Sequence, residues 1–225
     1  MQAELLFETL KVGSVPLWAA AQDHPFVDAL GDGSLERDRF AYYLKQDYLY
    51  LIGYSRAISL AAARSPSLQL LTEFNALAHE TLSAEMALHR EYCAQFGITE
   101  AELEQAEASP VCRAYSDFCI STAAGSDCIA LLAALIPCGV GYAEIGQRLL
   151  AGTKSNSDHP YCQWIETYTG QDYRVYADWM VATLDRLGSE LPASRLSELQ
   201  QLFNTGCRYE WLFWEMAWTK QQWPL

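Results

Sequence analysis

The chain has 225 residues, 51% of them hydrophobic, and a formal net charge of −13, so it is long enough to bury a sizeable core while its field repels phosphate backbones. No basic patch offsets that charge, which argues against direct nucleic-acid binding. The seven cysteines are odd in number and contain no Cys-x-x-Cys pair, which favours reduced thiols in a cytoplasmic protein. Neither a signal peptide nor a run of about 18 uncharged apolar residues occurs, so we expect no secretion and no membrane span.

Apolar residues recur at helical spacing through the first half of the chain. After an amphipathic opening, a short helix is expected to start near Pro25. Ser34 is placed to cap a long helix over residues 35–64, and Ser65 to cap the next one over 66–96. A glycine at position 97 then predicts a helix stop.

The second half repeats this pattern of caps and apolar helical runs. Thr99 and Glu102 form a predicted capping box, and Ser109 precedes a proline that starts a further helix. The remaining expected helices cover residues 133–150, 161–168, 171–187 and 195–218. Because no alternating strand pattern and no internal repeat is present, the sequence predicts an all-α antiparallel bundle forming a single domain over residues 1–225.

The segment Ala133–Leu150 places Cys138 directly after Pro137 inside an apolar helical run. The proline has no N–H to donate, so a kink is expected there. Tyr142 lies one turn on and shares the face of Cys138. Cys138 is therefore either a small hydrophobe of the core or a reactive thiol near a phenol.

Asp47 and Tyr50 are three residues apart and share one face of an aromatic-rich helix. Burying an unpaired carboxylate costs several kcal/mol, so Asp47 needs a donor partner or a ligand that supplies N–H groups. The alternative is a carboxylate that tyrosines of the same helix satisfy.

Glu210 lies among Tyr209, Trp211 and further aromatic residues near the end of the chain. A glutamate between aromatic walls holds its proton to higher pH and is suited to general acid catalysis, unless its side chain reaches water. Glu215 is the expected solvent-facing member of this helix. Tyr115 and Tyr168 are not informative on their own.

The histidines raise the question of a metal site. His79, Glu80, Glu85 and His89 fall close together, but their spacing differs from the Glu-x-x-His pairs of carboxylate di-iron bundles. His24 precedes a proline and is expected to pack or cap. We therefore expect no metal site here, and no phosphate-binding glycine loop or serine-hydrolase motif occurs.

Several motifs in order, QDYLYL, AALIPC with Tyr142 and Glu144-Ile-Gly after it, WIETY and YEWLFWEMAW, resemble the TenA family, whose activity is thiaminase II or aminopyrimidine aminohydrolase. The similarity starts at HPF and GDGSLERDRFAYYLKQD and runs over nearly the whole chain. It implies a haem-oxygenase-like helical bundle, a homotetramer and a role in thiamine salvage without a metal or organic cofactor.

The resemblance also implies roles for individual residues. Cys138 corresponds to the nucleophile of the cysteine-bearing branch, and Glu210 to the acid/base. The implied pyrimidine pocket consists of Asp47, Tyr50, Tyr115, Tyr142, Tyr168 and Phe213. Gly139 and Val140 depart from the bulkier residues expected after the cysteine.

The implied reaction is hydrolysis of 4-amino-5-aminomethyl-2-methylpyrimidine, and of thiamine as a further substrate, to the hydroxymethyl pyrimidine. Thiolate addition to the unsubstituted ring carbon would make an electron-rich ring that expels the leaving group. One alternative is a non-catalytic pyrimidine-binding or regulatory protein on the same fold. A metal-dependent oxidase that uses His79, Glu80, Glu85 and His89 is another.

Overall fold

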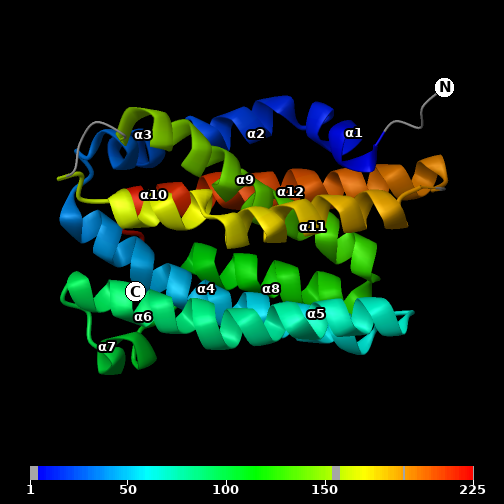
Figure 1. Cartoon of the computed structure of the whole chain (residues 1–225), viewed down its shortest axis with the longest axis horizontal. Coiled ribbons are helices and arrows are strands. Elements are labelled where there is room, and N and C mark those ends of the chain that lie inside the picture. The colour runs from blue at the N-terminus through cyan, green and yellow to red at the C-terminus, as the bar shows by residue number, and fades with distance from the viewer. Residues whose placement is uncertain (1–4, 154–157, 190, 225) are drawn as a thin grey trace. The chain divides into compact units, whose positions relative to one another are not determined.

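A computed structural model describes residues 5–153, 158–189 and 191–224. These residues form helices joined by short connections, and no strand occurs among them. By its contacts the chain divides into two compact units (Figure 1). The first unit comprises Met1–Leu35 and Leu132–Glu215, and the second comprises Glu36–Leu131 and Met216–Leu225. The expectation of a single domain over residues 1–225 stays a prediction.

The helices of the described ranges are α1 (Leu6–Val12), α2 (Val15–Gln22), α3 (Pro25–Asp32), α4 (Arg37–Ala63), α5 (Leu68–Glu80), the π-helix η1 (Thr81–Glu85), α6 (Met86–Gln95), α7 (Glu100–Glu104), α8 (Pro110–Gly125), α9 (Cys128–Thr153), α10 (Cys162–Thr169), α11 (Gln171–Leu187) and α12 (Ala193–Thr219). Two long helices, α9 and α12, contribute to both units. The all-α prediction is confirmed.

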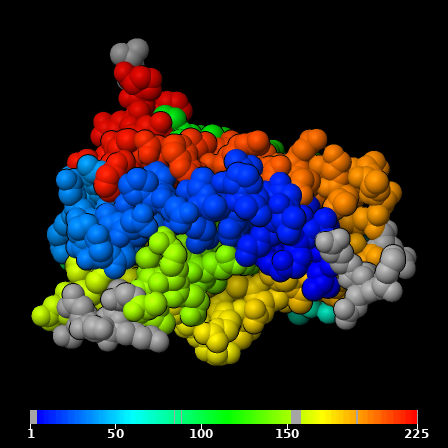
Figure 2. All heavy atoms as spheres, turned by 90° about the horizontal axis from the view of Figure 1, so that it is seen from above, coloured from blue at the N-terminus to red at the C-terminus, as the bar shows by residue number. Residues whose placement is uncertain are grey.

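The first unit packs α1 and α2 against α9 and α12, and Figure 2 shows the blue N-terminal helices flanked by the yellow-green and orange-red segments. The ring of Trp18 stacks on Phe203 with 5.7 Å between centroids. Its indole N–H donates to Glu144 at 2.9 Å, and the Lys11 ammonium pairs with the same carboxylate at 2.5 Å. An apolar stack with a polar rim thus fixes α2 on α9 and α12.

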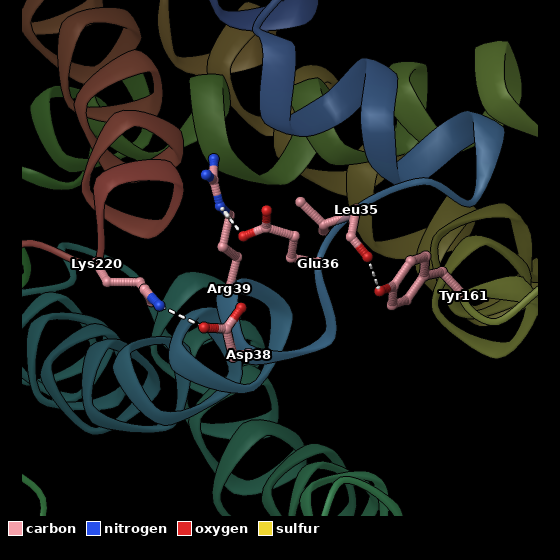
Figure 3. A network of polar contacts seen from close by, with 6 residues as sticks. All are labelled: Leu35, Glu36, Asp38, Arg39, Tyr161 and Lys220. Carbon is pink, nitrogen blue, oxygen red and sulfur yellow. Dashed lines mark hydrogen bonds and ion pairs between the residues drawn. The ribbon is translucent and has the colours of Figure 1, made fainter.

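A glycine allows α12 to approach α9 closely within this unit. A Cβ added at Gly206 would lie 2.5 Å from the carbonyl oxygen of Ala134 and 2.9 Å from Cγ of Pro137. Both distances are shorter than any real Cβ contact, so only glycine fits at this crossing. Elsewhere in the unit the Tyr161 hydroxyl donates to the carbonyl oxygen of Leu35 at 2.5 Å (Figure 3).

In the second unit, α5, α6, η1, α7 and α8 pack around α4 (Figure 1). A Cβ added at Gly53 would lie 2.6 Å from Oγ of Ser116, so α4 and α8 also cross at a glycine. The buried Gln46 side chain accepts from the backbone N–H of Ser109 at 2.8 Å and donates to the carbonyl of Glu107 at 3.0 Å. These two bonds hold the start of α8 against α4.

Charged groups close the start of α4, where Arg39 pairs with Glu36 at 2.8 Å (Figure 3). The Lys220 ammonium bonds to Asp38 and fixes the chain after α12 to the same turn (Figure 3). These pairs lie at the surface, where solvent screens the charges, so each contributes little to stability.

Several local predictions are confirmed. Thr99 and Glu102 form the capping box of α7, and Ser109 caps α8 by accepting from the N–H of Cys112 at 3.1 Å. Gly97 has a φ of 78°, the left-handed conformation expected after a helix. The helix predicted over residues 171–187 has those ends.

Three local predictions are wrong. The helix α4 begins at Arg37 and its cap is Glu36 without a side-chain bond, so Ser34 lies two residues before the cap position. Ser67 rather than Ser65 caps the following helix. The helix predicted over 66–96 is three elements, since the π-helix η1 interrupts it.

The buried helix predicted around Cys138 is confirmed as part of α9, in which every residue from Ala130 to Ile136 has no exposed surface. Among the described residues one window, Cys128–Ala151, is long and apolar enough to cross a membrane, and 83% of it is buried inside the protein. Such burial is typical of a core helix. Pro137 lies inside α9, and its predicted kink stays a prediction.

Candidate active site

Cys138 differs from most of the other cysteines in its accessibility. None of the seven is in a disulfide bond, and only Cys138 and Cys162 are half-buried rather than buried. Burial raises the pKa of Cys93, Cys112 and Cys207 to about 12, so these thiols are poor nucleophiles near neutrality.

Cys162 is also disfavoured as a nucleophile. Its thiol donates to the Glu166 carboxylate at 3.2 Å, and this bond raises the pKa of the thiol. Because Cys119 and Cys128 are buried as well, Cys138 is the cysteine best suited to react with a ligand.

An aromatic cluster lies one helical turn after Cys138. The ring of Tyr142 meets the edge of Tyr168 with centroids 4.9 Å apart, and it lies 5.0 Å from the ring of Trp214. Gly146 makes this contact possible, because a Cβ there would lie 3.1 Å from Cβ of Tyr168. The structure thus brings together two of the predicted pocket tyrosines, on α9 and α10.

The predicted acid, Glu210, lies on α12 within the first unit and is only 4% exposed. Its charge contributes to the raised pKa of Cys207, after the larger effect of burial. Phe213, less than one turn later, is also buried. The prediction that Glu210 escapes solvent is confirmed, and its role as an acid stays a prediction.

Gly139 has no room for a larger side chain. A Cβ added there would lie 2.5 Å from Sδ of Met180 and 2.9 Å from the hydroxyl oxygen of Tyr176. Both residues belong to α11, which therefore fills the space that a bulkier residue after Cys138 would need. Because α11 fills this space, glycine fits at position 139, where a bulkier residue was expected.

Asp47 is buried on α4 in the second unit, at 7% exposure. Tyr43, one turn earlier, donates its hydroxyl to the carboxylate at 3.3 Å. Burial raises the pKa of Asp47 to about 7, and the Tyr43 bond opposes this only in part. The Asp47 carboxyl is therefore bonded by a tyrosine of its own helix, which is one of the two interpretations of the sequence. This single bond offsets only part of the cost of burying the charge.

Tyr50 and Tyr115 meet across α4 and α8. Their ring centroids are 4.7 Å apart with an interplanar angle of 33°, and both side chains are buried. The close crossing of α4 and α8 at Gly53 brings these two rings together. The structure thus joins a second pair of the predicted pocket residues.

Sequence reasoning missed the partner of Asp47. His89 on α6 places Nδ1 at 3.7 Å from the Asp47 carboxylate, and Glu85 on η1 is close enough for the Asp47 charge to raise its pKa. The sequence singled out both residues, but as metal ligands. Within the described ranges no three His, Cys, Asp or Glu side chains are placed to hold one metal ion.

His24 and Glu215 lie in contact with each other in the first unit. His24 caps α3 by accepting from the backbone N–H of Phe26 at 3.1 Å, as predicted for a packing or capping histidine. Its other ring nitrogen lies 3.1 Å from Glu215, whose side chain is 38% exposed. Glu215 is thus more exposed than Glu210, as expected.

The chain is similar over most of its length to known proteins. A relative from Halalkalibacterium halodurans named "Aminopyrimidine aminohydrolase" is 39% identical over 209 residues, which are 92% of this chain and 93% of that relative. The model of the TENA/THI-4/PQQC family matches residues 14–220. The chain belongs to this family.

Solved structures agree with the family assignment. A TenA homologue from P. horikoshii OT3 superposes with a TM-score of 0.90 at 28% identity, over 96% of this chain and 99% of that one. A domain from Shewanella denitrificans described as having a heme oxygenase-like fold gives 0.76 at 13% identity, over 95% and 92% of the two chains. The haem-oxygenase-like helical bundle is therefore confirmed, as is the resemblance to TenA.

Proposed function

We propose that the protein is a thiamine-salvage hydrolase that converts 4-amino-5-aminomethyl-2-methylpyrimidine and water to 4-amino-5-hydroxymethyl-2-methylpyrimidine and ammonia. The observation that carries this proposal is the similarity, over nearly the whole of both chains, to a relative named for that activity. The family membership and the half-buried Cys138 on α9 support it. Thiamine, with a thiazole as leaving group, is the second substrate to test.

The proposed chemistry uses Cys138 as nucleophile. Its thiolate adds to the unsubstituted ring carbon, which makes the ring electron-rich enough to expel the protonated amine as ammonia from the exocyclic methylene. Water then adds to that methylene and loses a proton, which replaces the one that left with ammonia, and the thiolate leaves the ring. Glu210 protonates a ring nitrogen during the addition and takes the proton back on release, a contribution of roughly 10²- to 10⁴-fold.

The remaining predicted residues bind the ring in this proposal. Asp47 contacts the exocyclic amine, and aromatic side chains stack on the ring or supply hydroxyls. Two pairs of rings are in contact, Tyr142 with Tyr168 and Tyr50 with Tyr115. Each pair lies beside a close approach of two helices, which supports a role for these rings as walls of the binding site. Phe213 is buried, as a stacking residue requires.

An ammonia-release assay tests the proposed function. The aminomethyl pyrimidine and thiamine are supplied separately, and ammonia, thiazole and the hydroxymethyl pyrimidine are quantified. Release of ammonia with one equivalent of hydroxymethyl product is the expected result. Binding of the pyrimidine without any product would instead support the non-catalytic or regulatory alternative.

The wider expectations belong to the same proposal. We expect a cytoplasmic homotetramer that needs no metal or organic cofactor and binds neither nucleic acid nor membranes. Light scattering coupled to gel filtration measures the mass of the assembly. Activity that survives treatment with a metal chelator would count against the oxidase alternative.

A further inference from the structure

In the second unit a buried acid that the proposed mechanism uses, Asp47, lies beside a histidine that it does not use, His89. Asp47 lies on α4, and His89 lies on α6 with Nδ1 at 3.7 Å from the Asp47 Oδ2 atom. Both side chains are about 10% exposed, 9% for Asp47 and 10% for His89. Water therefore contributes little to the solvation of a charge on either group.

The tautomer of His89 follows from its second contact. Nε2 lies 2.8 Å from the carbonyl oxygen of Leu44, which can only accept, so Nε2 carries the hydrogen. In the neutral imidazole Nδ1 then has a lone pair, and this lone pair faces the Asp47 carboxyl. A negative charge on Asp47 repels this lone pair, so the arrangement favours the protonated, neutral carboxyl.

A neighbouring carboxyl also disfavours a negative charge on Asp47. It belongs to Glu85 on η1, whose pKa burial and the Asp47 charge together raise to about 7. The thiols of Cys93 on α6 and Cys112 on α8, whose pKa burial and the Asp47 charge raise to about 12, stay neutral and supply no charge. On α4 itself the Tyr43 hydroxyl donates to the carboxyl and is the group here that favours ionisation.

More distant charges do not reverse this balance. On α5 the exposed Glu80 adds negative charge near Glu85. Lys45 on α4 pairs with Glu102 of α7 at 3.7 Å, and Arg90 on α6 pairs with Glu100 at 3.5 Å. Both cations are thus paired with surface glutamates rather than with Asp47.

We infer that His89 is a positioning residue that keeps Asp47 protonated, so that Asp47 meets the aminopyrimidine as a neutral acid rather than as a carboxylate. This inference rests on the proposed function for the identity of the ligand. Because Oδ2 faces His89 and accepts from Tyr43, Oδ1 carries the proton in this arrangement, and the carboxyl presents an O–H donor beside a carbonyl acceptor. The aminopyrimidine edge presents the complementary pair, a ring nitrogen that accepts and an exocyclic N–H that donates.

The raised pKa of Asp47, about 7, agrees with this geometry. Burial lowers the pKa of His89, so the histidine stays neutral in the same range. Below pH 7 the pair is therefore neutral and binds the pyrimidine edge with two hydrogen bonds. Above pH 7 Asp47 loses its proton, one donor is lost, and the affinity is expected to fall.

The test measures binding of the hydroxymethyl pyrimidine by calorimetry between pH 5.5 and 8.5. In His89→Asn an amide N–H replaces the Nδ1 lone pair and stabilises the Asp47 carboxylate. The pH midpoint of binding should then fall by about one unit, which weakens the affinity roughly fivefold at pH 7 and about tenfold at pH 8.5, with little change at pH 5.5. Because the ligand's own titration is the same for every variant, the difference between variants isolates the protein group.

Two variants serve as controls. His79→Gln changes an exposed histidine of α5 and should leave the midpoint in place. Asp47→Asn should remove the protein-dependent inflection, since an amide does not titrate. A His89→Asn profile that superimposes on wild type, or an equal loss of affinity at every pH, would overturn the inference.

A second measurement needs neither ligand nor substitution. With only four histidines in the chain, nitrogen-15 spectra of histidine-labelled wild-type protein can resolve each ring. The expected spectrum shows His89 neutral, with hydrogen on Nε2 and none on Nδ1, at pH 6 to 7. Hydrogen on Nδ1 in that range would overturn the inference, whatever the ammonia-release assay shows.

Discussion

At the scale of single residues, the proposed chemistry depends on the thiol of Cys138. The other six cysteines are less suited to act as the nucleophile. Five cysteines are buried, and the Cys162 thiol is tied to Glu166. Cys138 is half-buried, although the residues of α9 from Ala130 to Ile136, shortly before it, are fully buried. Part of the Cys138 side chain is therefore accessible, unlike those of the five buried cysteines.

We predict that Cys138→Ala abolishes turnover but retains binding of the hydroxymethyl pyrimidine, because the thiol forms the covalent bond whereas other side chains hold the ring. Ammonia release and calorimetry measure the two properties. Cys162→Ala is the matched control, since it removes the other half-buried thiol and should leave both unchanged. Near-normal turnover in Cys138→Ala would contradict the assignment of the nucleophile.

Alkylation gives an independent prediction for the same residue. A small thiol reagent should modify Cys138 and Cys162 before the five buried cysteines, because only these two are half-buried. Saturating hydroxymethyl pyrimidine should protect Cys138 by at least about tenfold and leave Cys162 unprotected. Peptide mass spectrometry measures both sites in one sample, and equal protection of the two would contradict a site at Cys138.

Glu210→Gln is predicted to lower kcat by about 10²- to 10⁴-fold and to remove the limb of the pH profile that the carboxyl produces. The glutamine keeps the volume and a hydrogen-bonding group at a position only 4% exposed, so the fold should survive. Steady-state kinetics across pH 5 to 9 test this. A variant with the wild-type pH profile would exclude an acid/base role for Glu210.

At the scale of helices, close approach at glycines positions the side chains of the site. Gly146 lets α10 bring Tyr168 to Tyr142, and Gly53 lets α8 bring Tyr115 to Tyr50. Small residues allow backbones to approach, so the rings on either side meet at short range. The π-helix η1 is a second local feature of this region. It interrupts a long helical run at the point where Glu85 lies near Asp47.

Gly206→Ala is predicted to destabilise the protein by about 1–3 kcal/mol, although alanine is the better helix former, because the new Cβ would lie 2.5 Å from the Ala134 carbonyl oxygen. Urea unfolding measures the change. Gly125→Ala, at the end of α8, is the control, since nothing lies within 4 Å of its Cβ. It should be neutral or slightly stabilising, and equal destabilisation of the two would refute the steric argument.

At the scale of the whole molecule, a net charge of −13 combines with buried carboxyls that resist ionisation. The pKa of Glu85 rises from its ordinary value near 4.5 to about 7 on folding. Between these values the folded state binds more protons than the unfolded state, so the contribution of Glu85 to stability falls as pH rises from about 4.5 to 7. Asp47 acts with the same sign.

Glu85→Gln is therefore predicted to stabilise the protein at pH 8, by about 1–3 kcal/mol, and to have a smaller effect at pH 5. Glutamine avoids the cost of a buried charge while keeping a group that can bond to Thr81. Glu80→Gln, which changes an exposed carboxylate, should have a small effect at both pH values. A gap between Glu85→Gln and wild type that does not grow with pH would contradict the prediction.

The sequence by itself determined the all-α class and, to within a few residues, most helix ends. These follow from local rules, because caps, glycine stops and helical periodicity act over a few residues. The family and the side chains proposed for the chemistry came instead from the resemblance of several ordered motifs to TenA. The errors at Ser34 and Ser65 arose because the cap of each helix lies two residues after the predicted one, and the error at η1 because the helix type changes there.

Only the tertiary structure decided which distant side chains meet. His89 reaches Asp47 from another helix, Tyr176 occupies the space beside Gly139, and Gly206 rests against Pro137. None of these contacts has a sequence signal, because each depends on where two helices cross and on the volume of the side chains between them. Periodicity tells which face of a helix is buried, whereas packing alone selects the partner.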